Sequence, residues 1–137
     1  MKPIVVNELG SINISEDVIE KIVFSEMLKC KDKLIPCNKN GRPLTKSDIN
    51  KSKDSFGSVD VSFDDDVITV EINYIALFGK SIKKSAKELF KNIIDIFSMI
   101  GIETHVIIYA NVKGIMSDKV AAREIRITWN NNRVEVL

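Results

Sequence analysis

The stretch VITVEINYIALFGKSIKKSAKELF, residues 67–90, decides the fold class of this 137-residue chain. Its first part mostly alternates apolar and polar side chains, which is the period of a strand and predicts one over Val67–Phe78. After the turn Gly79-Lys80-Ser81, apolar residues recur every three or four positions, which predicts a helix over Ile82–Ile100 with Ser81 as its N-cap. A long strand followed directly by an amphipathic helix indicates a sheet with helices packed against it.

The residues on either side predict the remaining elements. Ser15 is a suitable N-cap for a helix over Glu16–Cys30. Alternation predicts further strands, which are Ser11–Ile14, Ser58–Phe63 and Ile102–Val112, and a C-terminal hairpin of Glu124–Trp129 and Arg133–Leu137 around Asn130-Asn131-Asn132. Asp64-Asp65-Asp66 is expected to form a hairpin turn rather than a cation site, and Ser117–Ala122 a short helical turn.

This order of elements predicts the α+β class. The expected architecture is a two-layer βαββαβ arrangement, with a mostly antiparallel sheet, two helices on one face, and the C-terminal β-hairpin added to it. Residues 1–115 are predicted to form a single domain and residues 116–137 the hairpin appendage. The lysine-rich segment at about 31–57 is either a mobile excursion or a functional loop, with a helical turn expected at Thr45–Asn50.

Charge and cysteine content limit the class of protein further. Lys and Arg number 20 against 19 Asp and Glu, a net charge of +1 that argues against a dedicated polyanion binder. Cys30 and Cys37 lack the further ligands of a zinc site, so they are expected to be thiols in a reducing compartment. No apolar run comes close to the length of a membrane span, which is about 20 residues, and no signal peptide is recognised. We therefore expect a cytoplasmic protein.

No catalytic, cofactor-binding or metal-binding residue is predicted. Gly79-Lys80-Ser81 resembles the end of a phosphate-binding loop, but the required earlier glycine position is Tyr74, so a tight turn is the better interpretation. His105 is the single histidine, and no nucleophile is paired with it in the sequence, so a structural role is expected. We therefore predict that the protein is not an enzyme.

A row of lysines forms the first candidate surface. Lys80, Lys84, Lys87 and Lys91 fall on one side of the predicted helix. Such a face is usually solvated, and the other interpretation is an anionic partner such as a nucleic acid. The chain has no aromatic-rich strand motif for stacking bases and no Gly-x-x-Gly between helices, so nucleic-acid binding is unsupported.

The second candidate surface is the face of the sheet turned away from the helices. Strand alternation places Ile75, Leu77, Ile107 and Tyr109 on it, and such an apolar patch needs a cover. The C-terminal hairpin offers one, since Ile125, Ile127 and Trp129 share a face. We predict that the hairpin either folds over this open face or extends a sheet edge, in its own chain or a neighbour's. Trp129 therefore joins the candidate interaction residues.

The sequence also resembles the alkaline shock protein family of Gram-positive bacteria, also called the envelope stress response family. The resemblance covers about Gly10–Ile115. It is carried by Leu9–Ile19 (LGSINISEDVI), Val70–Tyr74 (VEINY), Phe78–Ile82 (FGKSI) with Ala86, Met99–Ile102 (MIGI), Val106, Ile108 and Val112–Ile115 (VKGI). It implies a non-enzymatic cytosolic protein of cell-envelope homeostasis, without cofactors. Some relatives are implied to self-associate or to reach the membrane through a separate, membrane-anchored partner.

These observations predict a cytosolic accessory protein in envelope stress response or homeostasis. It would act through protein–protein contacts or self-association, as a homo-oligomer or with a protein partner, including one anchored in the membrane. The alternative is a nucleic-acid-binding module that uses the lysine-rich helix face. Retention on RNA or DNA that is sensitive to salt would discriminate between the two.

Overall fold

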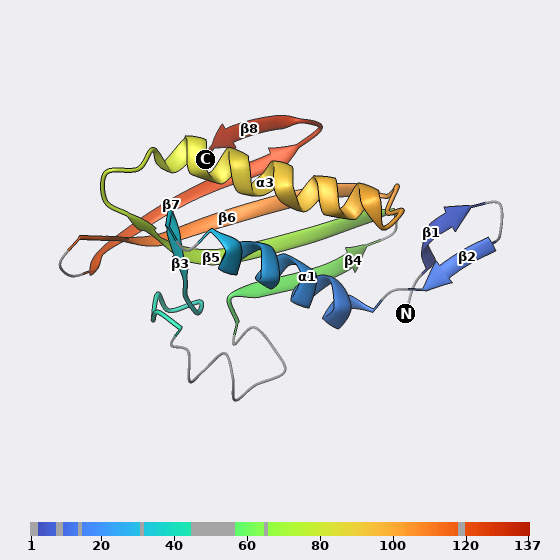
Figure 1. Ribbon diagram of the computed structural model, residues 1–137, viewed down its shortest axis with the longest axis horizontal. Coiled ribbons are helices and arrows are strands. Elements are labelled where there is room, and N and C mark those ends of the chain that lie inside the picture. Colours follow the sequence, from blue (N-terminus) through green and yellow to red (C-terminus); the bar gives the residue numbers. More distant parts are fainter. Residues whose placement is uncertain are drawn as a thin grey trace.

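The computed structural model describes residues 3–7, 10–13, 15–30, 32–44, 57–64, 66–117 and 120–137, with side chains from residue 15 onward (Figure 1). It has two helices and eight strands within those residues. The elements in chain order are β1 (Pro3–Asn7), β2 (Gly10–Asn13), α1 (Glu16–Lys29), β3 (Leu34–Pro36), β4 (Val59–Asp64), β5 (Val67–Leu77), α3 (Ile82–Met99), β6 (His105–Met116), β7 (Val120–Asn130) and β8 (Arg133–Val136).

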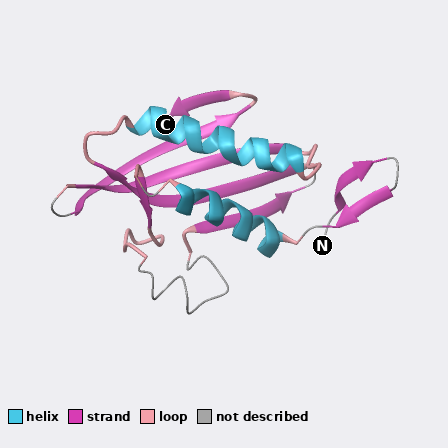
Figure 2. Cartoon of the chain, viewed as in Figure 1, coloured by secondary structure: helices cyan, strands magenta, loops and turns pink. Residues whose placement is uncertain are grey.

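Two layers make up the main body, as predicted. Six strands form one sheet, and both described helices lie across the same face of it (Figure 2). All strand pairs are antiparallel except β5 with β6, whose parallel pairing is possible because α3 carries the chain back between them. The α+β class, the mostly antiparallel sheet and the C-terminal hairpin are therefore confirmed.

β5 organises the sheet. On one side β4 pairs with its first half and β3 with its last residues, and on the other side β6 pairs along its whole length. β7 and β8 then extend the sheet beyond β6. The hairpin thus extends the edge of its own sheet, which was one of the two arrangements predicted.

Three local predictions differ from the structure. The predicted strand Ser11–Ile14 appears as β2, but it pairs with β1 in a separate two-stranded sheet. The helical turn expected at Ser117–Ala122 is wrong, because β7 begins at Val120 and pairs with β6. The long loop also contains β3, whereas the turn expected at Thr45–Asn50 lies outside the described residues.

Both helices begin at the predicted caps. The Ser15 hydroxyl accepts a hydrogen bond from the Val18 amide at 3.3 Å, and the Ser81 hydroxyl accepts one from the Lys84 amide at 3.3 Å. Each serine satisfies an amide that the first helical turn leaves without a partner. Gly101 follows α3 with a φ of +88°, a conformation that side chains disfavour and that ends the helix.

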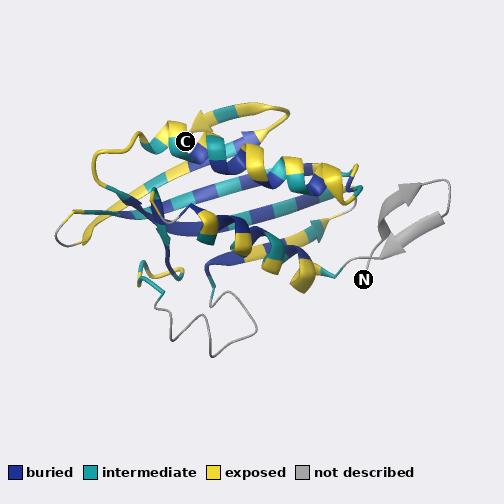
Figure 3. Cartoon of the chain, viewed as in Figure 1, coloured by how far each residue is buried: buried dark blue, intermediate teal, exposed yellow. Residues whose placement is uncertain are grey.

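The core lies between the two helices and one face of the sheet (Figure 3). From α3 it receives Ala86, Leu89, Phe90, Ile93 and Phe97, and from the sheet mainly Ile68, Val70, Ile72, Tyr74, Val106, Ile108, Ala110 and Val112. These are the positions that helical and strand periodicity predicts. Phe78 is the exception and is 74% exposed, because β5 ends at Leu77 and the turn at Gly79 directs the chain away.

One ion pair joins the loop before β3 to α3. Lys33 Nζ donates to Glu88 Oε2, and this hydrogen bond lowers the pKa of the Glu88 carboxyl and raises the pKa of the Lys33 ammonium. The contact spans 55 residues of sequence, so it stabilises the position of α3 relative to the start of β3.

The Tyr74 hydroxyl is buried without a hydrogen-bond partner. It lies in the core between sheet and helices, where Tyr74 is 1% exposed. Burial raises the pKa of the hydroxyl above its ordinary value. An unsatisfied buried donor costs stability, so this hydroxyl weakens the core in which its ring is packed.

Candidate functional site

The open face of the sheet has two regions, one apolar and covered, the other mixed and accessible. Ile75 was predicted to be a candidate interaction residue of this face, and the structure corrects this, since its side chain is fully buried within its own chain. Cys37, opposite Asn73, is likewise fully buried, and the segment that follows it returns to pair with it at Pro43. In that segment Gly41 lies beside Lys113 of β6, where an added Cβ would be 3.4 Å from the lysine Cβ.

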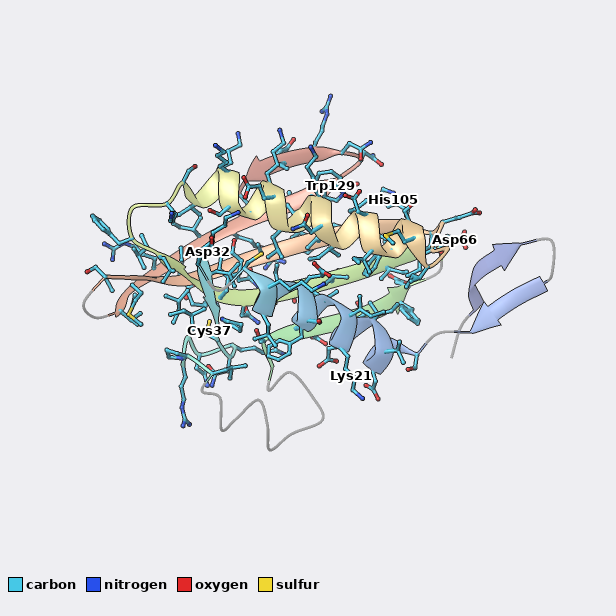
Figure 4. All side chains as sticks on the ribbon, in the orientation of Figure 1. Lys21, Asp32, Cys37, Asp66, His105 and Trp129 are labelled. Atoms are coloured by element: carbon cyan, nitrogen blue, oxygen red, sulfur yellow. The ribbon has the colours of Figure 1, made fainter. Side chains whose placement is uncertain are left out.

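Trp129 is also corrected. It was predicted to be an interaction residue, but it faces the helices, is 7% exposed, and packs against Phe90 of α3 with ring centroids 6.3 Å apart at 58° (Figure 4). Ile127 lies on the same side and is fully buried. The apolar side of the hairpin therefore completes the core instead of covering the open face.

The accessible region is centred on Tyr109 of β6. The Arg126 guanidinium from β7 lies over its ring, 4.2 Å from the centroid, and also donates to Glu71 of β5 at 2.7 Å. Three neighbouring strands thus contribute to one charged and aromatic cluster. Tyr109 and Ile107 of β6 are both half-buried. Leu77, the last residue of β5, is also half-buried.

A hollow of about 360 Å³ lies beside this cluster at the β7–β8 side of the sheet. It is lined by Tyr109, Thr128, Asn130, Asn131, Arg133, Glu135 and Leu137. The lining combines one aromatic ring with charges of both signs and amide groups. Tyr and Arg are enriched at energetically important positions of protein interfaces, so this composition suits contact with another protein.

A polar row separates the hollow from the covered region. Asn73 Nδ2 donates to the Gly57 carbonyl at 3.0 Å, and Asn111 Nδ2 donates to Asn73 Oδ1 at 3.2 Å. Ser58 Oγ donates to the Asn73 carbonyl at 3.0 Å. These groups hydrogen-bond to one another and to the backbone, so they hold the neighbouring strands in place.

A second hollow, of about 330 Å³, lies on the helix side where α3 ends and β6 begins. It is lined by Ile94, Phe97, Ser98, Ile102, Thr104, His105, Val106, Trp129, Asn131 and Asn132. His105 is exposed at its rim, at the first residue of β6. Much of the lining is core side chains, among them Phe97, Val106 and Trp129.

The predicted lysine face is where sequence periodicity placed it. Lys84, Lys87 and Lys91 are exposed on α3, opposite its buried stripe, and Lys80 is exposed in the preceding turn. In Gly79-Lys80-Ser81 the Ser81 hydroxyl is used as the helix cap, and Gly79 has a φ of +87°. This is the geometry of the tight strand-to-helix turn.

The two thiols lie in buried positions. Burial raises the pKa of Cys30, and burial raises the pKa of Cys37 to about 12. Both thiols are therefore almost fully protonated at neutral pH, which makes them poor nucleophiles. Among the described side chains, no group of His, Cys, Asp and Glu residues is placed to hold a metal ion.

Four residues of the accessible region were not predicted as site residues. They are Glu71, Arg126, Arg133 and Glu135. Strand alternation in residues 124–137 could have placed Arg126, Arg133 and Glu135 on one face, since Ile125, Ile127 and Trp129 occupy the other. The contact of Arg126 with Tyr109 requires the register between β6 and β7, which no sequence pattern gives.

The fold and this region define a small two-layer α+β protein with an accessible polar and aromatic cluster on the open side of its sheet. Residues 5–117 match the alkaline shock protein 23 family, described by a cell envelope-related function, and the chain belongs to that family. The resemblance noted in the sequence is thereby confirmed. No curated protein and no solved structure matches the chain.

The match covers most of the chain and ends at residue 117, directly after β6. β7 and β8, at Val120–Asn130 and Arg133–Val136, lie beyond the matched residues. Within the part of the chain that the structure describes, no helix has both the length and the apolar composition to cross a membrane.

Proposed function

We propose that this protein is a non-enzymatic, cytosolic accessory protein that acts through protein–protein contacts or self-association in envelope stress response or homeostasis. The observation that carries the proposal is the accessible cluster on the open face. Tyr109, Ile107 and the Arg126–Glu71 pair lie beside a hollow, and no described helix packs over them. Leu77 is a further candidate at the end of the same face.

The energetic reasoning favours a protein partner. A half-buried aromatic ring under a guanidinium offers apolar area together with directed hydrogen bonds, and it loses little side-chain entropy on binding. The side chains that line the hollow, such as Asn130, Arg133 and Leu137, are exposed, so the hollow is poorly suited to enclosing a small metabolite, because such ligands bury most of their surface in a deep cleft.

The test compares variants of the open face with a matched variant of the helix face. In cells, Ile107→Ser with Tyr109→Ser should release the protein from its envelope-associated fraction or complex, while Lys87→Ser with Lys91→Ser should not. Both double variants should keep native circular dichroism, because all four side chains are at least partly exposed. Release of the lysine variant with retention of the open-face variant would contradict the proposal.

The alternative function, a nucleic-acid-binding module, has one observation in its favour. Lys80, Lys84, Lys87 and Lys91 are all exposed, and three lysines along α3 with a fourth in the turn before it could contact successive phosphates. The same lysine variant provides the test. If this function is correct, the wild-type protein is retained on RNA or DNA at low salt, retention falls steeply as salt rises, and the lysine variant is not retained.

A further inference from the structure

The sheet ends on one side at β8, whose outer edge pairs with no described strand. Such an edge presents backbone groups that can pair with another strand. β8 lies beyond the residues that match the family, so its edge belongs to a part of the fold that this chain adds to the matched segment.

The register of the hairpin shows which backbone groups point outward. Asn130 faces Arg133 across a two-residue turn, in which Asn131 and Asn132 have φ values of +51° and +63°. The Leu137 amide donates to the Arg126 carbonyl at 2.7 Å. Hydrogen-bonded positions alternate in an antiparallel pair, so Arg133, Glu135 and Leu137 bond to β7. The N–H and C=O groups of Val134 and Val136 therefore point away from the sheet.

The side chains of β8 have two distinct faces. Val134 and Val136 lie opposite Trp129 and Ile127 on the helix side, and Val136 is 55% exposed. Arg133 and Glu135 line the hollow on the open side. One more strand at this edge would cover Val136 and would meet one positive and one negative side chain.

The opposite edge of the sheet gives a useful contrast. β4 carries Asp60 and Asp64 and no cation, so a second β4 laid against it would bring carboxylates toward carboxylates. Like charges directly opposite each other destabilise a strand pair. A two-fold β8 pair centred on Glu135 also brings two like charges together, but Arg133 of each copy lies diagonally beside them, so the contact carries no net charge. The charge pattern therefore opposes self-pairing at β4 more strongly than at β8.

We propose that β8 pairs antiparallel with β8 of a second copy about a two-fold axis, with Val134 of each copy opposite Val136 of the other. Four outward backbone hydrogen bonds are made and two valine pairs form on the helix side. Glu135 meets its symmetry mate on the open side, with Arg133 of each copy diagonally adjacent to it. The two open faces then form one continuous surface across twelve strands. This inference depends on the proposed function in one respect, which is that the protein acts through protein–protein contacts.

The contact area is small, so the association is expected to be weak, with a Kd of about 10–1,000 μM. In sedimentation equilibrium, the wild-type chain should pass from monomer to dimer between low micromolar and millimolar concentration. Val136→Pro removes only an outward N–H and should shift the equilibrium at least about tenfold toward monomer. Val136→Thr keeps that N–H and should dimerise as the wild type does.

A cross-link tests the register and does not depend on how well the proline variant folds. In the proposed pair the two Glu135 residues face each other at a non-hydrogen-bonded position, with Cα atoms about 4.5 Å apart, which suits a disulfide. Glu135→Cys should form a covalent dimer with diamide, and Arg133→Cys should do so far more slowly because its symmetry mate lies several residues away. The native cysteines are both buried and should not compete.

Two results would overturn this pairing. One is a wild-type chain that stays monomeric to millimolar concentration, and the other is equal cross-linking rates for Glu135→Cys and Arg133→Cys. The Ile107→Ser, Tyr109→Ser variant separates this inference from the proposed function. If it still forms the β8 cross-link but keeps its envelope association, the proposed open-face role fails and the β8 pairing stands.

Discussion

The two faces of the sheet use neighbouring residues of the same strands for different purposes. On the helix side, Ile108 is fully buried beneath α3 and contributes to the core. One residue earlier, Ile107 is only half-buried and lies on the open face, two residues from Tyr109 of the accessible cluster. Because strand side chains alternate, a single strand can stabilise the fold with one set of residues and offer a binding surface with the other.

The largest expected effect comes from removing the hairpin. Deleting residues 124–137 removes Ile127 and Trp129 from the core and exposes the edge of β6. The loss should exceed the about 3–5 kcal/mol that a single buried aromatic costs on truncation to alanine. Thermal melting followed by circular dichroism gives the measurement. Deleting only 133–137 should cost much less, because Trp129 and Ile127 remain, and equal losses would contradict this account.

The next effect separates the two faces directly. Ile108→Ala should lower the free energy of unfolding by about 2–5 kcal/mol, because it leaves a cavity under the helices. Ile107→Ala should lower it by less than about 1 kcal/mol, since this side chain is already partly in water. Urea unfolding of the two variants makes the comparison, and equal losses would show that the open face is covered in solution.

The sequence predicted the helix side well because burial on that side follows periodicity alone. The stripe of α3, the caps Ser15 and Ser81, and the buried positions of β5 and β6 all required only the helical and strand periods. The open side was predicted less well. Alternation placed Ile75 on that side, whereas Trp129 was assigned to it as part of a hairpin that would either cover this face or extend a sheet edge. The surroundings of both residues depend on contacts far apart in sequence.

Two physical causes explain these failures. The side of the hairpin that carries Trp129 depends on the register of β7 against β6, which is interrupted between Val112 and Gly114. An irregularity of one residue reverses which side chains face the core. The strand β3 was missed because three residues, Leu34–Pro36, are too few to show an alternation, and they are held by pairing with β5.

Tyr74→Phe tests how the helix side is packed, with a smaller expected effect. The substitution removes a buried hydroxyl that lacks a hydrogen-bond partner and keeps the ring. The free energy of unfolding should rise by about 1 kcal/mol or stay unchanged. A loss of more than 1 kcal/mol in urea unfolding would mean that the hydroxyl has a partner in solution.

Arg126→Ala tests the cluster on the open side. It removes the guanidinium from the Tyr109 ring and from Glu71, contacts worth about 0.5–1 kcal/mol at such a site. Stability should fall by no more than this amount, while partner binding should fall further. Lys91→Ala, an exposed position on α3, serves as the control that should change neither quantity.

The smallest expected effect is the pH dependence of the Lys33–Glu88 pair. The folded-state pKa of Glu88 is lowered, so its contribution is present above the unfolded pKa and is lost as the pH falls through the folded pKa. The folded-state pKa of Lys33 is raised, so its contribution is lost as the pH rises through that value. Glu88→Gln should flatten the acid limb of a stability–pH curve, and an unchanged limb would rule out this contribution.

The central claim is that the open side of the sheet binds protein while the helix side stabilises the fold. A photo-reactive amino acid placed at Tyr109, and in a separate variant at Lys91, tests it most directly in living cells. The account predicts that illumination gives a discrete cross-linked species from position 109, that the Ile107→Ser substitution abolishes it, and that position 91 gives none. Cross-links from position 91 with none from position 109 would contradict it.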